Sequence, residues 1–579
     1  MLFITISVLL WIFFFQSLGN IAILRNSAQN PFLSVWIGFF ITSFISLCIS
    51  IWLPMDNNVA RLLIGLVALS GIRPTLCSWR KIITGCKTRP LLLCTVCICL
   101  ILFSQSAVSY FAEMGFDTNL YHGQSVRWLR EYGIVPGLGN LHHRLAQISG
   151  WFALAAFMDW GPFMERTPFL LPPLWLMATF LYFSYSAFYA QCIQQRFYAI
   201  CILIISIIYV NNEFYPNINY DRVALIFYSI MICEMFPIFF IPVNEYSLPK
   251  QLRLVFILLA ASILFKPLAI PSLFFTMTLL SLLFWKNMIS VRSLTYILWI
   301  PALTALLWCV LNAIQSGYPF FPLTAFPLPF EWVMPQNSVD NIRIEVQAWA
   351  RHPGAGFREA FNEGLTYWFY PWLKRNFMQT TFKAGVVLPF IIGCTCWVMA
   401  FGQRNRQKAK LFFFFLSFTH LVYWFFQHPD FRFGLEFFWT WAALGMIFAF
   451  ISSPISSQDM LVSRRIRRIS LLIKIISLNR CAMIILIITT CIALTTTIKF
   501  LYSNNKINNL PLLHMPQRHE PFPGLRIYTM HSGSPQEFTV YFPPKNEFRC
   551  GNSPLPCTYV IQDIFLRDIK CLGKGFYIK

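Results

Sequence analysis

Charged residues are scarce in this chain. Only 12% of its 579 residues are Asp, Glu, Lys or Arg, whereas a soluble domain contains about 25%. These charges are too few to cover the surface of a soluble protein of this size, so most of the chain must lie in lipid. Hydrophobic residues make up 57% of the sequence and include 60 Phe. Several apolar runs exceed ~18 residues, the length that a helix needs to cross a bilayer.

Acidic residues are the scarcest charged class. The chain has 23 Asp and Glu but 45 Lys and Arg, which gives a formal net charge of +22. In a soluble protein this excess would suggest nucleic-acid binding. Here the basic residues fall mainly in short loops between apolar runs, as cytoplasmic loops of membrane proteins require. We therefore expect a lipid bilayer as a partner and no nucleic acid.

The first twenty residues lack the basic start and the small-residue cleavage site of a secretory signal peptide. We interpret them as the first membrane helix. Further along, the sequence shows no internal repeat and no low-complexity tract. The chain therefore does not read as a repeat array.

Fourteen apolar segments predict an all-α polytopic membrane protein. They cover approximately residues 1–24, 32–54, 60–75, 90–110, 168–190, 197–211, 222–242, 252–265, 268–286, 293–313, 384–402, 410–427, 433–453 and 481–500. The basic loops, of which 454–480 is the most basic, orient these spans. Both chain termini and the polar segments between spans then fall on one outer side. We expect it to be the periplasmic side of a bacterial inner membrane.

Composition divides the chain into four regions. They are the N-terminal helices (1–110), an outer loop (111–167), a membrane core that contains a second outer loop at 314–383 (168–500), and a tail (501–579). Segment 147–160 is apolar but too short to span, so we interpret it as a helix that lies in the interface or dips partway into the membrane. The tail is polar with alternating runs, which predicts a small outer appendix of strands and turns.

Two tail cysteines are candidates for a disulfide. Cys550 and Cys557 stand at the ends of the turn CGNSPLPC, and in an oxidising compartment they could close it. The alternative is that they and Cys571 are free thiols. Outside the cytoplasm, we favour the disulfide.

The stretch from Phe116 to Leu145 mixes acids, arginines, histidines and glycines between apolar segments. A membrane protein places such groups where water reaches them. Asp117 heads a predicted helix whose apolar face is expected against the membrane. A carboxylate there suits a general base, but Asp is also a favoured helix cap, and the sequence leaves both interpretations open.

Other polar residues of this stretch are candidates for substrate binding. They are His122, Arg127, His142 and Arg144. The histidine spacing, His143 included, fits no familiar closed metal site, and histidines also suit an ordinary wet loop. We therefore expect no metal and no other cofactor.

Two charged residues interrupt apolar runs near the same side. Asp221 begins a span as a possible second acid, although a solvated helix start explains it equally. Lys266 stands among apolar residues as FKP, which is costly unless it faces water or an anion. Its alternative is snorkelling to the surface.

The motif HPDFRF contains Asp430 and Arg432 directly before a long span. A guanidinium fork matches a phosphate group. Local pairing of Arg432 with Asp430 or Glu436 is the alternative. Tyr318 lies in an aromatic, proline-rich loop that suits a sugar face or lipid tail, although interface anchoring explains it nearly as well.

These residues resemble a known class. An acid in the first large outer loop, followed by an amphipathic helix, is similar to GT-C membrane glycosyltransferases. The sequence D-x-R-F at 430–433 resembles their acid-x-Arg-aromatic motif. The resemblance is closer to uncharacterised bacterial multi-pass membrane proteins, with matching patterns at 117–122, 131–145, 316–322, 429–433 and 550–558.

The resemblance implies a GT-C-like fold and an inverting enzyme that uses a polyprenyl-phosphate sugar. By position, Asp117 matches the catalytic acid, Asp221 a second outer-loop acid, and Arg432 a lipid-phosphate contact. Many GT-C enzymes carry paired acids, whereas Thr118 follows Asp117 here, which weakens any requirement for a divalent metal.

We therefore expect a membrane glycosyltransferase that transfers a sugar to a glycan, lipid or protein acceptor of the cell envelope. One alternative is a glycan ligase or polymerase, which would favour an arginine-rich outer loop. The other is a non-enzymatic flippase or transporter of lipid-linked glycans, which would favour polar groups at mid-membrane in broken helices.

Overall fold

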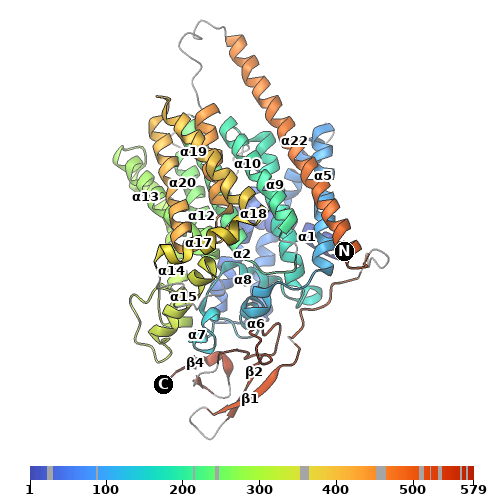
Figure 1. Ribbon diagram of the computed structural model, residues 1–579, viewed down its shortest axis with the longest axis vertical. Helices are drawn as coiled ribbons and strands as arrows, with labels where there is room; N and C mark the ends of the chain where they lie inside the picture. Colours follow the sequence, from blue (N-terminus) through green and yellow to red (C-terminus); the bar gives the residue numbers. More distant parts are fainter. Residues whose placement is uncertain are drawn as a thin grey trace.

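The computed structural model describes the chain apart from residues 23–29, 86–88, 213–214, 242–246, 353–363, 452–463, 507–513, 522, 532–536, 561–563, 569–570 and 579. In the described part, twelve helical segments are long and apolar enough to cross a membrane. The protein is thus an all-α polytopic membrane protein with a small strand-containing tail (Figure 1). The basic loop predicted at 454–480 lies partly outside the described residues.

Helices α1, α2, α5 and α9 to α14 form most of the bundle, with α19, α20 and α22. Their bounds are α1 Leu2–Ala22, α2 Leu33–Ser50, α5 Arg89–Phe111, α9 Thr167–Tyr189, α10 Ile193–Asn212, α11 Asp221–Phe240, α12 Leu248–Phe265, α13 Ile270–Trp285, α14 Val291–Ser316, α19 Leu388–Phe401, α20 Gln407–Gln427 and α22 Arg464–Ser503. Each corresponds to a predicted span, because a long apolar run must form a helix to satisfy its backbone in lipid.

Two predicted spans differ in form from these twelve. The span predicted at 60–75 is a bent pair, α3 (Asn58–Ser70) and α4 (Ile72–Gly85), with an angle of 53° between them. At the break, a Cβ on Gly71 would lie 1.8 Å from the Ser17 carbonyl oxygen, so only glycine allows this close approach to α1. The span predicted at 433–453 is the shorter helix α21 (Leu435–Met446), which continues as the π-helical turn η7 (Ile447–Ile451).

The polar loops gather at one end of the bundle, called the tail end here. Figure 1 shows α6, α7 and the tail strands at this end, while α22 extends beyond the other helices at the opposite end. Hydrogen bonds tie the loops together: Asp56 N donates to Arg130 O (2.8 Å), Gly115 N to Pro216 O (2.9 Å), and Gly551 N to Asn119 O (2.8 Å). Four stretches far apart in the sequence, at residues 56, 115–130, 216 and 551, therefore meet at the tail end.

Short elements build this end. They are η1 (Thr118–His122), α6 (Gly123–Glu131), α7 (Leu138–Leu141), η2 (His143–Ala146), α8 (Gly150–Met158), η4 (Pro267–Ala269), α15 (Gln336–Arg351), α17 (Leu365–Phe377) and η6 (Phe431–Phe433). With nine residues, α8 is too short to span, in line with the prediction for 147–160. All nine residues of α8 are buried, and the helix packs on α2 and α6. Its contacts are therefore with protein, and its depth in the membrane stays a prediction.

The apolar face of α6 also packs on protein rather than on the membrane, contrary to the prediction. The Trp128 ring is buried and meets the Phe576 ring edge to face, with centroids 5.8 Å apart. Phe576 belongs to the tail, whose strands are β1 (Arg526–His531), β2 (Glu537–Phe542), β3 (Phe565–Leu566) and β4 (Phe576–Tyr577), in two antiparallel pairs. The tail therefore covers the helix that follows Asp117.

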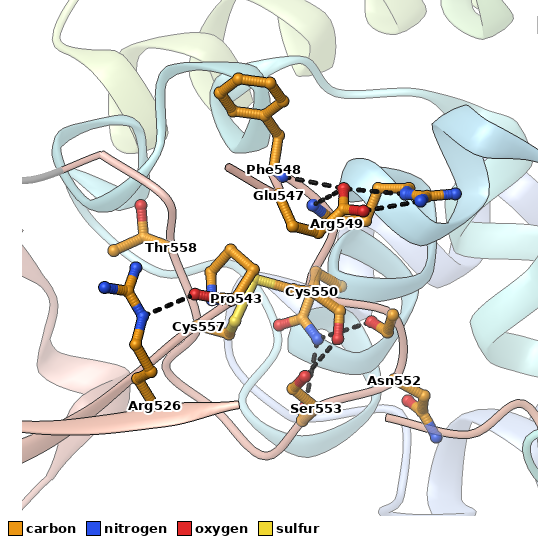
Figure 2. The surroundings of a disulfide bond; sticks show 12 residues. Arg526, Pro543, Glu547, Phe548, Arg549, Cys550, Asn552, Ser553, Cys557 and Thr558 are labelled. Carbon is orange, nitrogen blue, oxygen red and sulfur yellow. Dashed lines mark hydrogen bonds and ion pairs between the residues drawn. A yellow bond between two sulfur atoms is a disulfide. The ribbon is translucent and has the colours of Figure 1, made fainter. Parts of the chain in front are cut away.

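A disulfide joins Cys550 and Cys557, the pair that the sequence singles out (Figure 2). The loop that it closes is hydrogen-bonded to α6, where Gln124 Nε2 donates to Gly551 O (2.9 Å) and Ser553 O (3.1 Å). On the other side, Thr558 Oγ1 donates to Leu141 O (2.8 Å). The disulfide loop and the residue that follows it thus connect α6 to α7.

Candidate functional site

Two acid–base pairs lie at the tail end. Arg432 Nη1 stands 3.4 Å from Asp117 Oδ2, and Lys266 Nζ donates to Asp221 Oδ1. The Asp117 and Arg432 side chains are 39% and 37% exposed, whereas those of Lys266 and Asp221 are 18% and 8% exposed. One pair is therefore partly exposed to solvent and the other is largely covered.

The structure tests one of the two interpretations of Asp117, that of a helix cap. This residue precedes η1, but its side chain makes no capping hydrogen bond to the backbone. Its carboxylate turns instead toward Arg432, which follows 315 residues later in the chain. Asp117 is therefore free of a capping role, and its carboxylate faces a cation in a partly open position.

Electrostatics keep Asp117 ionised. Burial acts to raise the pKa of its carboxyl, but the positive charge of Arg432, followed by those of Arg144 and Lys266, outweighs it. The net pKa lies below its ordinary value. Asp117 is thus a carboxylate at neutral pH, and a weak base for as long as Arg432 is its partner.

A local network fixes the position of Arg432. Asp430 Oδ1 accepts from Arg432 N (2.9 Å) and so caps the turn η6, and it lies 3.5 Å from the side-chain Nε. Pairing with Asp430 therefore occurs alongside pairing with Asp117. Glu436 is not a partner of Arg432: it is buried and lies 3.6 Å from the guanidinium of Arg222.

Arg222 is a residue that the sequence analysis missed. Its side chain is 1% exposed, and Nη1 donates to the backbone oxygen of Arg432 (2.6 Å). The guanidinium also lies over the Tyr209 and Phe431 rings, at 5.3 and 5.9 Å. An arginine in the first turn of an apolar span was the available signal, since such a charge needs a partner inside the bundle.

Lys266 lies at the break between α12 and η4, where the backbone is extended. Its Nζ lies over the Phe433 and Tyr220 rings, at 4.2 and 4.8 Å. The side chain therefore points into the site toward Asp221 and does not snorkel to the surface. Burial lowers the pKa of Lys266, against the opposing effect of Asp221.

His122 lies beneath this group and is 3% exposed. Neither of its ring nitrogens has a hydrogen-bond partner within the described structure. The ring packs against those of Tyr121, Phe152 and Tyr220, with centroids 4.3, 5.1 and 5.3 Å away. Burial lowers the pKa of His122 to about 4, so the ring is neutral at pH 7.

His142 and Arg144 form the side of the site next to the tail. His142 Nδ1 accepts from Arg144 N (3.1 Å), and its ring meets Tyr559 of the tail at 4.7 Å. Arg144 donates to Glu345 (3.3 Å) and lies over the Tyr121 ring at 5.6 Å. Burial lowers the pKa of His142, so its ring is neutral. The ring contributes packing to this side of the site and no positive charge.

Two predicted substrate-binding residues are engaged elsewhere. Arg127 pairs with Glu131 (2.7 Å) and donates to the Asn552 and Ser553 carbonyl oxygens, so it holds the disulfide loop. Tyr318 is buried, and its hydroxyl donates to Met334 O (3.0 Å). The structure does not bring either side chain into the group around Asp117.

A separate small hollow lies beside α6, lined in part by Arg130, Asp159, Glu165 and His519. Arg130 pairs with Asp159 (2.8 Å) and with Glu131 (2.7 Å). The charges here balance one another and join loop 111–167 to the tail. Among the described residues, no three His, Cys, Asp or Glu side chains gather closely enough to hold a metal ion.

A family model matches residues 1–439 and carries the description "Domain of unknown function (DUF8201)". The chain belongs to the DUF8201 family. No curated protein and no solved structure matches it. The DUF8201 match contains Asp117, Asp221, Lys266 and Arg432, whereas the disulfide loop lies beyond it.

The buried histidine suggests a test of stability. In the unfolded chain, His122 binds a proton as the pH falls below 6.5, the ordinary pKa of histidine. In the folded state, it binds that proton only at about pH 4. Stability should therefore fall with pH in this window, by about 2 kcal/mol at pH 5 for this residue. We expect His122→Phe to remove that part of the loss, because Phe keeps the aromatic contacts and does not titrate.

The measurement is thermal unfolding of the purified protein in detergent at pH 7 and pH 5. His514→Gln, at an exposed position of the tail, is the control and should leave the pH dependence unchanged. If the His122→Phe variant loses stability on acidification as steeply as the unmodified protein, the conclusion that His122 is buried in its neutral form is wrong.

Proposed function

We propose that this protein is a membrane glycosyltransferase. It transfers a sugar from a polyprenyl-phosphate donor to a cell-envelope acceptor at the tail end of the bundle. The observation that carries the proposal is the pair of Asp117 and Arg432, an ionised carboxylate 3.4 Å from a guanidinium in a partly open position. A carboxylate suits the deprotonation of an acceptor hydroxyl, and a guanidinium suits the binding of a donor phosphate.

The proposed chemistry assigns one task to each. The acceptor hydroxyl attacks the anomeric carbon, and a new C–O bond forms there. Its proton passes to the Asp117 carboxylate. The bond from the anomeric carbon to the donor phosphate breaks, and the phosphate leaves with the electron pair as an anion. Arg432, with Lys266 behind it, stabilises that developing charge.

Donor binding would also activate the base. A phosphate that binds Arg432 draws the guanidinium away from Asp117 or shares its charge. The carboxylate then loses its principal stabilising cation, which raises its proton affinity when the acceptor is bound. Asp430 and Arg222 hold the arginine backbone in place during this exchange.

Two observations support a periplasmic tail end in a bacterial inner membrane. Among the described residues, the basic loops between α13 and α14 and between α19 and α20 fall at the opposite end, where the positive-inside rule predicts the cytoplasm. The disulfide lies at the tail end, and disulfides persist in oxidising compartments. The lipid phosphate would approach from the outer leaflet.

The test is mass spectrometry of cell-envelope glycans from cells with and without the protein. We expect the loss of one sugar from an otherwise intact glycan or lipid. Loss of whole chains would favour the ligase or polymerase. Accumulation of a lipid-linked precursor on the cytoplasmic side would favour a flippase, and an unchanged envelope would contradict the proposal.

A further inference from the structure

A second carboxylate lies at the other end of the helix that carries Asp221. Helix α11 begins at Asp221 and ends at Phe240. Glu234 stands six residues before its end, which is about 9 Å inside the bundle from the opposite end. The residue is 5% exposed. It takes no part in the chemistry proposed above.

Among the described residues, the donors that contact the Glu234 carboxylate are neutral. Tyr182 Oη donates to Oε1 (2.6 Å), and Gln251 Nε2 lies 3.3 Å from Oε2 and 2.7 Å from the backbone oxygen. In the described part of the chain, no Lys, Arg or His forms an ion pair with it. Within the part of the chain that the structure describes, Glu234 therefore has no cation to balance its charge.

Glu436 is a matched comparison within the same bundle. It is also an acid in an apolar helix and is 1% exposed. Its carboxylate lies 3.6 Å from the Arg222 guanidinium and accepts from the Tyr209 hydroxyl. The two acids share their burial and a tyrosine donor, and they differ in the cation.

This difference decides the state of each group. An unpaired carboxylate away from water costs several kcal/mol, and such a group neutralises itself by taking a proton. A paired carboxylate keeps its charge. We propose that Glu234 is a proton-binding site of the bundle, filled from the water at the opposite end.

The surrounding side chains offer a route to that water. Gln251 lies in the first turn of α12 and is partly exposed, so it connects the carboxyl group to the opposite end. Cys192 Sγ contacts Gln195 Oε1 (3.9 Å), in a polar group on α9 to α11 that continues through Cys233 to Tyr182. A proton that leaves water forms an O–H bond on Glu234 and returns to water when that bond breaks.

Carbodiimide labelling tests the proposal. Dicyclohexylcarbodiimide enters membranes and adds to protonated carboxyl groups, and the stable adduct is located by mass spectrometry of peptides. With the full-length protein in membrane vesicles at pH 7, we expect Glu234 to be labelled at least about tenfold more than Glu436, given an ion-pair difference of several kcal/mol. Labelling of Glu234 should decrease as the pH rises and disappear in Glu234→Gln.

Infrared spectroscopy of the same protein gives an independent reading. The carbonyl band of a protonated carboxylic acid should be lost in Glu234→Gln and retained in Glu436→Gln. Equal labelling of the two acids, or an unlabelled Glu234 together with an unchanged carbonyl band, would overturn the proposal. Neither result would affect the glycosyltransferase proposal, because that rests on groups at the tail end.

Discussion

Asp117→Asn is expected to abolish the envelope modification that depends on this protein. The amide keeps the shape of the side chain but cannot accept a proton from the acceptor hydroxyl, and a general base contributes at least about 100-fold to rate. The lost pair with Arg432 is partly exposed, so the free energy of unfolding should change by only about 1 kcal/mol or less. The variant should therefore accumulate normally in the membrane while its product is missing.

The measurement is complementation of cells that lack the protein, with the product read by mass spectrometry and the protein by immunoblot. Asp340→Asn is the matched control, because Asp340 is an acid at the tail end that pairs with Arg343 (3.8 Å) on the surface of α15. It should restore the product fully. Full activity of Asp117→Asn would remove Asp117 as the base.

Arg222→Met is expected to cause the largest loss of stability. It leaves Glu436 buried without its cation, and breaking a buried ion pair by removing one partner costs about 3–5 kcal/mol. It also removes the donor to the Arg432 carbonyl oxygen. We expect a clear decrease in the thermal unfolding temperature in detergent and a low level of protein in the membrane.

The double variant Arg222→Met with Glu436→Gln separates stability from function. Neutralising Glu436 removes the buried charge, so much of the lost stability should return. Activity should not return, because the backbone that positions Arg432 still lacks its donor. A double variant that is no more stable than Arg222→Met would contradict the pairing, and one that recovers full activity would contradict the positioning role of Arg222.

The membrane helices were predictable because their signal is local. The length and the apolarity of a run such as that of α1 can be read directly from the sequence. In lipid such a run must form a helix, because its backbone groups have no water with which to form hydrogen bonds. The exceptions have tertiary causes. The bend at Gly71 depends on contact with Ser17 of another helix, and the burial of α8 depends on α2 and α6.

The candidate site was predictable only in part. Asp117, Asp221, Lys266 and Arg432 stand out as charges beside apolar runs, and the structure brings them together. The pairing of these charges depends on packing between helices that are distant in the sequence. The sequence alone therefore could not distinguish a capping role from a catalytic role for Asp117. Arg127 is also a charged residue in this polar stretch, yet it donates to carbonyl oxygens of the tail and does not join the site.

The pairing of distant residues has a consequence for biosynthesis. Arg432 is made 315 residues after Asp117 and 210 residues after Arg222. At about 5–20 residues per second, Arg222 waits on the order of 10–40 s before α21 arrives with its counter-charge. During that interval a cation stands at the head of α11 without Glu436. Nascent chains that stop before α21 should therefore be favoured substrates for membrane quality control.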